Sequence, residues 1–191
     1  MLVPSLEFLH LEVGSRIVKD MILGLALGLL IIRLVLGLTL AAHGAQKLFG
    51  WFGGSGLDGF GKAMERLNIR PPRLFALLAG LGEFGGGLLV ALGFLSPAGP
   101  LIVMGAMAVA ILTVHISKGF FNTGGGFEFP LLIFASCLAL SMMGPGPYSL
   151  DGALRISLPE PAAWILFALL SAIGVLGALG SRRLGHRQEL A

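Results

Sequence analysis

The sequence predicts an all-α protein, a polytopic transmembrane helix bundle with a four-helix core and a fifth transmembrane helix at the C-terminus. Two observations on composition favour a membrane protein. The 191 residues have a mean hydropathy of +0.91 and only 12% of them are charged, whereas a soluble domain is about one-quarter charged. Thirty residues are glycine, which is more frequent in transmembrane helices than in soluble ones because it lets two backbones approach closely.

The third observation is a series of five apolar segments, most of them close to the length of about 20 residues that a helix needs to cross a bilayer. Clusters of proline or glycine bound most of these segments, as expected at helix ends. The predicted spans are residues 21–42, 74–95, 98–116, 128–143 and 162–180, of which the fourth is short.

These spans divide the chain into three parts. Residues 1–20 form an N-terminal segment of different composition, so Met21 is an alternative to Met1 as the initiator. Residues 21–154 form the four-helix core. An amphipathic helix is expected at the membrane interface near residues 57–69, where apolar residues recur at helical spacing. Residues 155–191 add the fifth helix and a basic tail.

Lysine and arginine are concentrated in the first loop and the C-terminal tail, which lie on one side of the membrane if there are five spans. The positive-inside rule then predicts a cytoplasmic first loop and C-terminus, in a multi-pass protein of the cell (inner) membrane. The basic residues do not cluster with aromatic ones, so the net charge of +3 predicts no nucleic-acid partner. The single cysteine, Cys137, is interpreted as a small buried residue.

Charged residues within the predicted spans are costly in lipid and are usually paired or functional. Arg33 lies ten residues before His43, and Glu83 lies ten residues after Arg73, on helices that run in opposite directions. At a rise of about 1.5 Å per residue both would lie near the midplane. We therefore predict an Arg33–Glu83 ion pair, which either fixes the register of two helices or handles a ligand or proton.

Further polar residues are expected near one leaflet. Arg33, His43 and Lys47 share one helical face, while His115 ends the third predicted span and Glu128 begins the fourth. A carboxylate and two imidazoles can relay protons or bind the carbonyl of a quinone headgroup. The candidate pocket comprises Arg33, His43, Gln46, Lys47, Glu83, His115 and Glu128.

Haem and metal ions are the other ligands that histidine and carboxylate side chains bind. His43 and His115, on facing helices, offer an alternative site for haem b. No close-spaced His, Asp or Glu motif predicts a metal site.

Four segments in this order resemble the DoxX family of small bacterial and archaeal membrane proteins. They are "RLVLGLTLAAHGAQKLFGWFGG", "GEFGGGLLVALG", "TVHISKGFFNTGGGFEFPL" and "GPGPYSLDGAL", which together cover about residues 30–154. The resemblance implies a four-helix core, from which the fifth helix departs. It also marks as family-like the polar positions Arg33, His43, Gln46, Lys47, Glu83, His115, Glu128 and Asp151.

The resemblance further implies redox partners, because relatives resemble subunits of thiosulfate–quinone oxidoreductase systems or partners of superoxide-detoxifying and sulfurtransferase proteins. The sequence contains no dithiol, iron–sulfur motif or flavin fold, so the chain is not expected to be catalytic alone. The main hypothesis is an auxiliary subunit of a quinone- or sulfur-linked redox complex. The alternatives are a small anion transporter and a purely structural subunit.

Overall fold

The computed structural model describes residues 6–188, with side chains described for residues 15–182. All regular structure in this part of the chain is helical, which confirms the predicted fold class. The helices are α1 (Leu6–Phe49), α2 (Gly56–Arg66), α3 (Pro72–Leu92), α4 (Ala98–Ala110), α5 (Glu128–Met143), α6 (Leu150–Leu154) and α7 (Ala162–Gln188). A π-helical segment, Ile111–His115, continues α4, and short 3-10 turns occupy Trp51–Gly53, Ile116–Lys118 and Asn122–Gly124.

Four helical segments are long and apolar enough to cross a bilayer: Ser15–Phe49, Pro72–Leu92, Ala98–Lys118 and Ala162–Arg182. Helix α5 is apolar as well but has only 16 residues. Its observed bounds, Glu128–Met143, are those predicted.

The first predicted span, residues 21–42, lies within a longer helix that begins at Leu6, so its bounds differ at both ends. Helix α1 does not stop at residue 42 but continues to Phe49. It ends where Gly50 takes a left-handed φ of 72°, a conformation that glycine adopts without a steric penalty. Gly44, in contrast, lies inside the helix. This extension changes which residues of α1 face α3.

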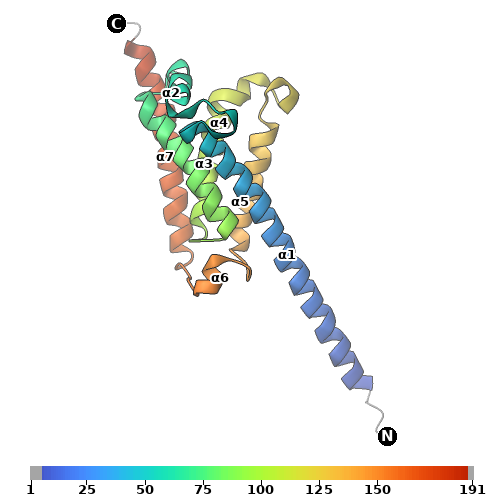
Figure 1. Ribbon diagram of the computed structural model, residues 1–191. Coiled ribbons are helices and arrows are strands. Elements are labelled where there is room, and N and C mark those ends of the chain that lie inside the picture. Colours follow the sequence, from blue (N-terminus) through green and yellow to red (C-terminus); the bar gives the residue numbers. More distant parts are fainter. Residues whose placement is uncertain (1–5, 189–191) are drawn as a thin grey trace.

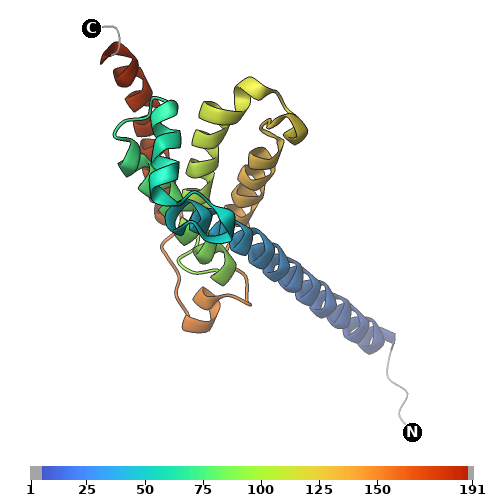
Figure 2. The ribbon, with the colours of Figure 1, turned by 45° about the horizontal axis from the view of Figure 1, so that its top comes forward.

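Helices α3, α4, α5 and α7 form the body of the bundle, and α1 crosses it at a tilt (Figure 1). The N-terminal part of α1 runs out beyond the bundle on the side where α6 lies, and Figure 2 shows the same departure from another direction. All side chains of residues 15–25 are exposed. With 44 residues α1 is about 66 Å long, well beyond the about 30 Å of a hydrocarbon core.

Glycines set the register between α1 and α3, which form the most extensive helix contact. A Cβ atom added to Gly37 would lie 2.8 Å from the Ala91 Cα, and one added to Gly44 would lie 2.6 Å from the Phe84 Cα. Such distances leave no room for a side chain, so the two backbones meet directly at both levels. The antiparallel register that results places the end of α1 beside the middle of α3.

A central apolar cluster joins α1, α4 and α5. It comprises Leu40, Val103, Met107, Ile133 and Cys137. Cys137 is fully buried in it, which confirms its interpretation as a small interior residue. Helix α7 packs on α4, and the Ser171 hydroxyl donates a hydrogen bond to the Leu101 carbonyl at 2.8 Å.

The predicted amphipathic helix near residues 57–69 is α2, which packs on the first half of α3. Its Met64 side chain is buried with Ile69 and Ala76, while Lys62 and Glu65 are exposed. One face of α2 is therefore part of the protein interior, while its location at the membrane interface stays a prediction.

Candidate functional site

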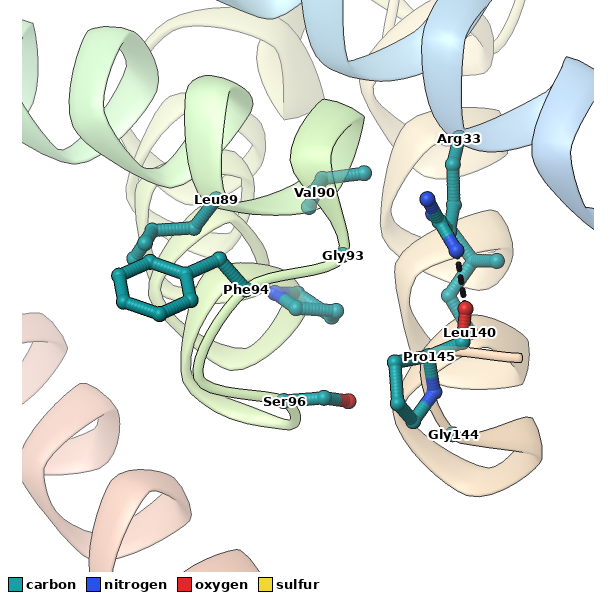
Figure 3. Close-up of a pocket in the computed structure, with 10 residues that line it drawn as sticks. Arg33, Leu89, Val90, Gly93, Phe94, Ser96, Leu140, Gly144 and Pro145 are labelled. Atoms are coloured by element: carbon teal, nitrogen blue, oxygen red, sulfur yellow. Dashed lines mark hydrogen bonds between the residues drawn. The ribbon is translucent and has the colours of Figure 1, made fainter. Parts of the chain in front are cut away.

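Arg33 lies at the end of the bundle near α6, where backbone carbonyls surround its guanidinium. Its nitrogens donate hydrogen bonds to the carbonyls of Pro145, Tyr148 (2.8 Å) and Ala91 (3.4 Å). Figure 3 shows the side chain pointing from α1 toward Pro145, with Gly93 beside it. Arg33 is only 4% exposed. The adjoining cavity has about 10 Å³, room for about one water molecule.

The predicted Arg33–Glu83 ion pair is wrong. The carboxylate of Glu83 pairs with Lys47 instead. The cause is the register, because α1 continues to Phe49 and the contacts of Gly37 and Gly44 place Arg33 beside Gly93, at the end of α3. Arg33 therefore lies where α3 ends and not at the level of its middle. The prediction assumed that Arg33 and Glu83 each lie about ten residues from the same face of the membrane. This assumption is wrong for Arg33, because α1 ends at Phe49.

Asp151, a position marked by the DoxX resemblance, is a buried anchor at the same end of the bundle. Its two carboxylate oxygens accept hydrogen bonds from the backbone N–H groups of Leu95 (2.9 Å) and Ser96 (2.8 Å). The side chain is 4% exposed. It ties α6 to the connection between α3 and α4, so it has a structural role in closing this end.

A further charged group of the interior is the carboxylate of Glu83. It pairs with Lys47 and so joins the end of α1 to the middle of α3. Glu83 is 3% exposed, and its Oε1 accepts a hydrogen bond from Lys47 Nζ. Its Oε2 is buried and has no hydrogen-bond partner among the described residues. Lys47 Nζ also lies 5.1 Å from the centre of the Phe60 ring, a cation–π contact to α2. Lys47 thus connects three helices.

This ion pair lines a cavity of about 490 Å³. Helices α3, α4 and α7 form its walls, and α2 contributes Phe60 and Met64. Small-molecule sites typically have about 300–1,000 Å³ and apolar walls with a few polar groups, and this cavity fits that description. Its polar lining residues are Lys47, Glu83, Thr113, His115 and Ser171.

The π-helical segment Ile111–His115 supplies one stretch of the cavity wall, including Thr113 and His115. Such segments are rare and frequently occur at functional sites. The Thr113 hydroxyl donates a hydrogen bond to the Val109 carbonyl at 2.7 Å. His115 Nδ1 lies 2.7 Å from the Gly125 carbonyl. Since a carbonyl can only accept, Nδ1 carries the hydrogen, and Nε2 of the neutral ring is an acceptor.

The structure thus brings three of the seven predicted pocket residues, Lys47, Glu83 and His115, to one cavity. The other four do not line it and have other surroundings. Arg33 lies with the carbonyls described above. Gln46 Nε2 donates to the Phe52 carbonyl at 3.2 Å, and Glu128 Oε2 accepts from the Asn122 N–H at 2.9 Å. The exposed His43 ring lies with its centre 6.3 Å from that of Phe129.

Sequence reasoning missed two contributors to this cavity. One is the π-helical segment, because hydropathy treats residues 98–116 as one uniform helix. The other is α7, whose Ser171, Gly174 and Ala178 line the cavity. Helix α7 was predicted as a span, but its apolar pattern does not indicate which neighbour it contacts. The pairs of small residues on α4 and α7 were the available signal, since Gly105 lies directly against Ser171.

Fold and cavity together define a helical membrane protein with an apolar internal site that contains one ion pair. The DoxX family model matches residues 28–116, so this part of the chain carries a DoxX domain. The match confirms the resemblance and covers the packed part of α1, then α2, α3, α4 and the π-helical segment. It leaves α5 and α7 outside. Neither the comparison with curated proteins nor that with solved structures finds a match.

Proposed function

We propose that the protein binds a lipid-soluble ligand of the quinone class in the cavity between α3, α4 and α7, as an auxiliary subunit of a membrane redox complex. The single observation that carries this proposal is Glu83, a residue that lines an apolar cavity of about 490 Å³ and whose buried Oε2 has no partner among the described residues. A buried polar atom without a partner is destabilising. A polar headgroup bound beside Glu83 would remove this cost.

The distribution of polar groups supports an amphipathic ligand. Lys47, Glu83 and His115 can bind the oxygens of a ring, while the apolar walls accommodate an isoprenoid or alkyl tail. Lys47 has further N–H donors beyond the one directed at Glu83, since an ammonium group carries three. The neutral His115 ring offers Nε2 as an acceptor. Headgroup and tail thus have matching surroundings within one cavity.

The proposed role is to hold and orient the ligand for a partner that transfers electrons. The sequence contains one cysteine and no recognisable electron carrier, so an oxidoreductase reaction needs another protein. Membrane or peripheral redox proteins are the partners that the family resemblance implies. The bilayer surrounds the helices, and a cell (inner) membrane location remains part of the proposal.

Three other functions receive less support. An anion transporter required Arg33 at mid-membrane, but its guanidinium is held by carbonyls at the end of the bundle. A structural clamp between Arg33 and Glu83 does not exist in this register. Ligation of haem b by His43 and His115 is disfavoured because only His115 lines the cavity, while His43 is exposed beside Phe129.

The proposed orientation places the first loop and the C-terminus in the cytoplasm, based on the excess of Lys and Arg there. A Lys62→Cys variant tests this, because Lys62 is exposed and the native Cys137 is fully buried. A membrane-impermeant maleimide should label this variant in inverted vesicles and leave it unlabelled in intact spheroplasts. The opposite pattern would reverse the orientation.

Blocking the cavity tests the binding proposal. A Cβ atom added to Gly174 has nothing within 4 Å, and Gly174 lines the cavity, so the ring of a Gly174→Phe variant has room to occupy it. Gly177 on the same helix has equally open surroundings but does not line the cavity, so Gly177→Phe is the matched control. We expect Gly174→Phe alone to weaken binding of a decyl-substituted quinone–quinol pair at least tenfold, measured by equilibrium dialysis in mild detergent. Equal binding by both variants would refute the proposal.

A further inference from the structure

We infer that the cavity selects a ligand that donates a hydroxyl hydrogen to Glu83, so that the reduced hydroquinone binds in preference to the quinone. This inference rests on the proposed binding function and adds the chemical form of the ligand. The juxtaposition that supports it is an ion pair at an apolar cavity, whose buried carboxylate has one oxygen without a partner among the described residues.

The two oxygens of the Glu83 carboxylate have different surroundings. Oε1 accepts a hydrogen bond from Lys47 Nζ, whereas Oε2 has no partner among the described residues. The side chain is 4% exposed, so bulk water does not compensate Oε2. An ionised carboxylate can only accept hydrogen bonds. A ligand group that satisfies Oε2 must therefore be a hydrogen-bond donor.

The direct contact with Lys47 identifies Glu83 as the carboxylate of an ion pair. Lys47 Nζ meets Glu83 Oε1, so the ammonium group is the partner of this oxygen alone. A protonated Glu83 would present a donor to the cavity, and this would favour a ligand carbonyl instead. Because Lys47 is in place, the acceptor form is the one that the structure supports. The preference for a donor thus depends on two residues from different helices.

A quinone and its hydroquinone differ in whether their ring oxygens can donate hydrogen bonds, and this is the property that the site distinguishes. The quinone ring carries two carbonyl oxygens, which accept hydrogen bonds and would repel the free Oε2. The hydroquinone carries two hydroxyl groups, and each can donate to a carboxylate and accept from an ammonium at the same time. One hydroxyl group can therefore bind Glu83 Oε2 and Lys47 Nζ together. The apolar walls give no comparable preference, since both forms have the same tail.

The inference is tested by titrating the purified protein with decylubiquinol and decylubiquinone under anaerobic conditions. A hydrogen bond to a charged group corresponds to a preference of about tenfold to a hundredfold, so the hydroquinone should bind tighter by that factor. Equal affinity, or tighter binding of the quinone, would overturn this inference and leave the proposed function intact. Binding of neither form would overturn the proposed function itself.

Substitution of Glu83 gives a second test. In a Glu83→Gln variant the amide can present an N–H donor to the cavity, so the preference for the hydroquinone should be lost or reversed. Because this change leaves Lys47 without its charged partner, a Lys47→Met/Glu83→Gln variant is measured in parallel and should also lose the preference. Glu65→Gln, which alters an exposed carboxylate on α2, is the matched control and should keep it. Retention of the full preference in both Glu83 variants would refute the role of Oε2.

Discussion

Arg33 and Lys47, two charged residues of α1, lie at opposite ends of its packed part and have different surroundings. At one end, Arg33 is surrounded by the carbonyls of Pro145, Tyr148 and Ala91, beside a cavity of only about 10 Å³. At the other end, Lys47 and Glu83 line a cavity of about 490 Å³, and one carboxylate oxygen has no partner among the described residues. Each end has one buried polar atom without a partner among the described residues, Arg33 Nε and Glu83 Oε2, but only Glu83 lies at a cavity large enough for a ligand. Burial alone therefore does not identify a binding residue.

The largest expected effect comes from the register that positions both ends. In a Gly37→Leu variant the new side chain would clash with the backbone at Ala91, so α1 and α3 could not pack closely. We expect loss of the folded monomer, measured as failure to elute as a single species in size-exclusion chromatography. Gly28→Leu is the control, because a Cβ at Gly28 has nothing within 4 Å. A well-folded Gly37→Leu protein would contradict the register.

The second largest effect is expected when the Lys47–Glu83 ion pair is broken. A Lys47→Met variant leaves Glu83 charged and buried without its partner, which should cost about 3–5 kcal/mol of unfolding free energy. Replacing both residues, as Lys47→Met/Glu83→Leu, should restore most of that stability because no unpaired charge remains. Thermal unfolding in detergent measures both variants. If the double variant is no more stable than the single one, the pair does not act as a unit.

A smaller loss is expected at the other end of α1. In Arg33→Leu the carbonyls of Pro145 and Tyr148 lose their donor at the connection between α5 and α6, which should cost about 2–3 kcal/mol. The same unfolding assay measures it, with Arg16→Leu as a control at an exposed site. Ligand affinity should change little, since Arg33 does not line the large cavity. A strong loss of binding with unchanged stability would reverse the roles assigned to the two ends.

These two ends also show how far sequence reasoning reaches. Hydropathy predicted the fold class and the bounds of α5, because both depend on local composition. It also singled out Arg33, Lys47 and Glu83, because charges are conspicuous among apolar residues. Which of them would pair depended on the position where α1 ends, and a glycine-containing segment such as residues 43–47 gives no clear sign of that position. Because α1 ends a few residues later than predicted, Glu83 pairs with Lys47 and not with Arg33.

The contribution of α7 could not be predicted for a related reason. Its residues are apolar around much of the helix, so hydropathy alone did not show that Ser171 faces α4 or that Gly174 lines a cavity. The packing of whole helices against one another determines these contacts. The same holds for the π-helical segment, whose residues resemble those of the helix before it.

The most direct test of ligand binding at the Lys47–Glu83 cavity is native mass spectrometry of the protein purified in mild detergent from its own membrane. We expect one lipid quinone or hydroquinone per chain on the native protein and on Gly177→Phe, and its loss from Gly174→Phe. A native protein that carries no such ligand, or equal ligand content in the two glycine variants, would contradict the account.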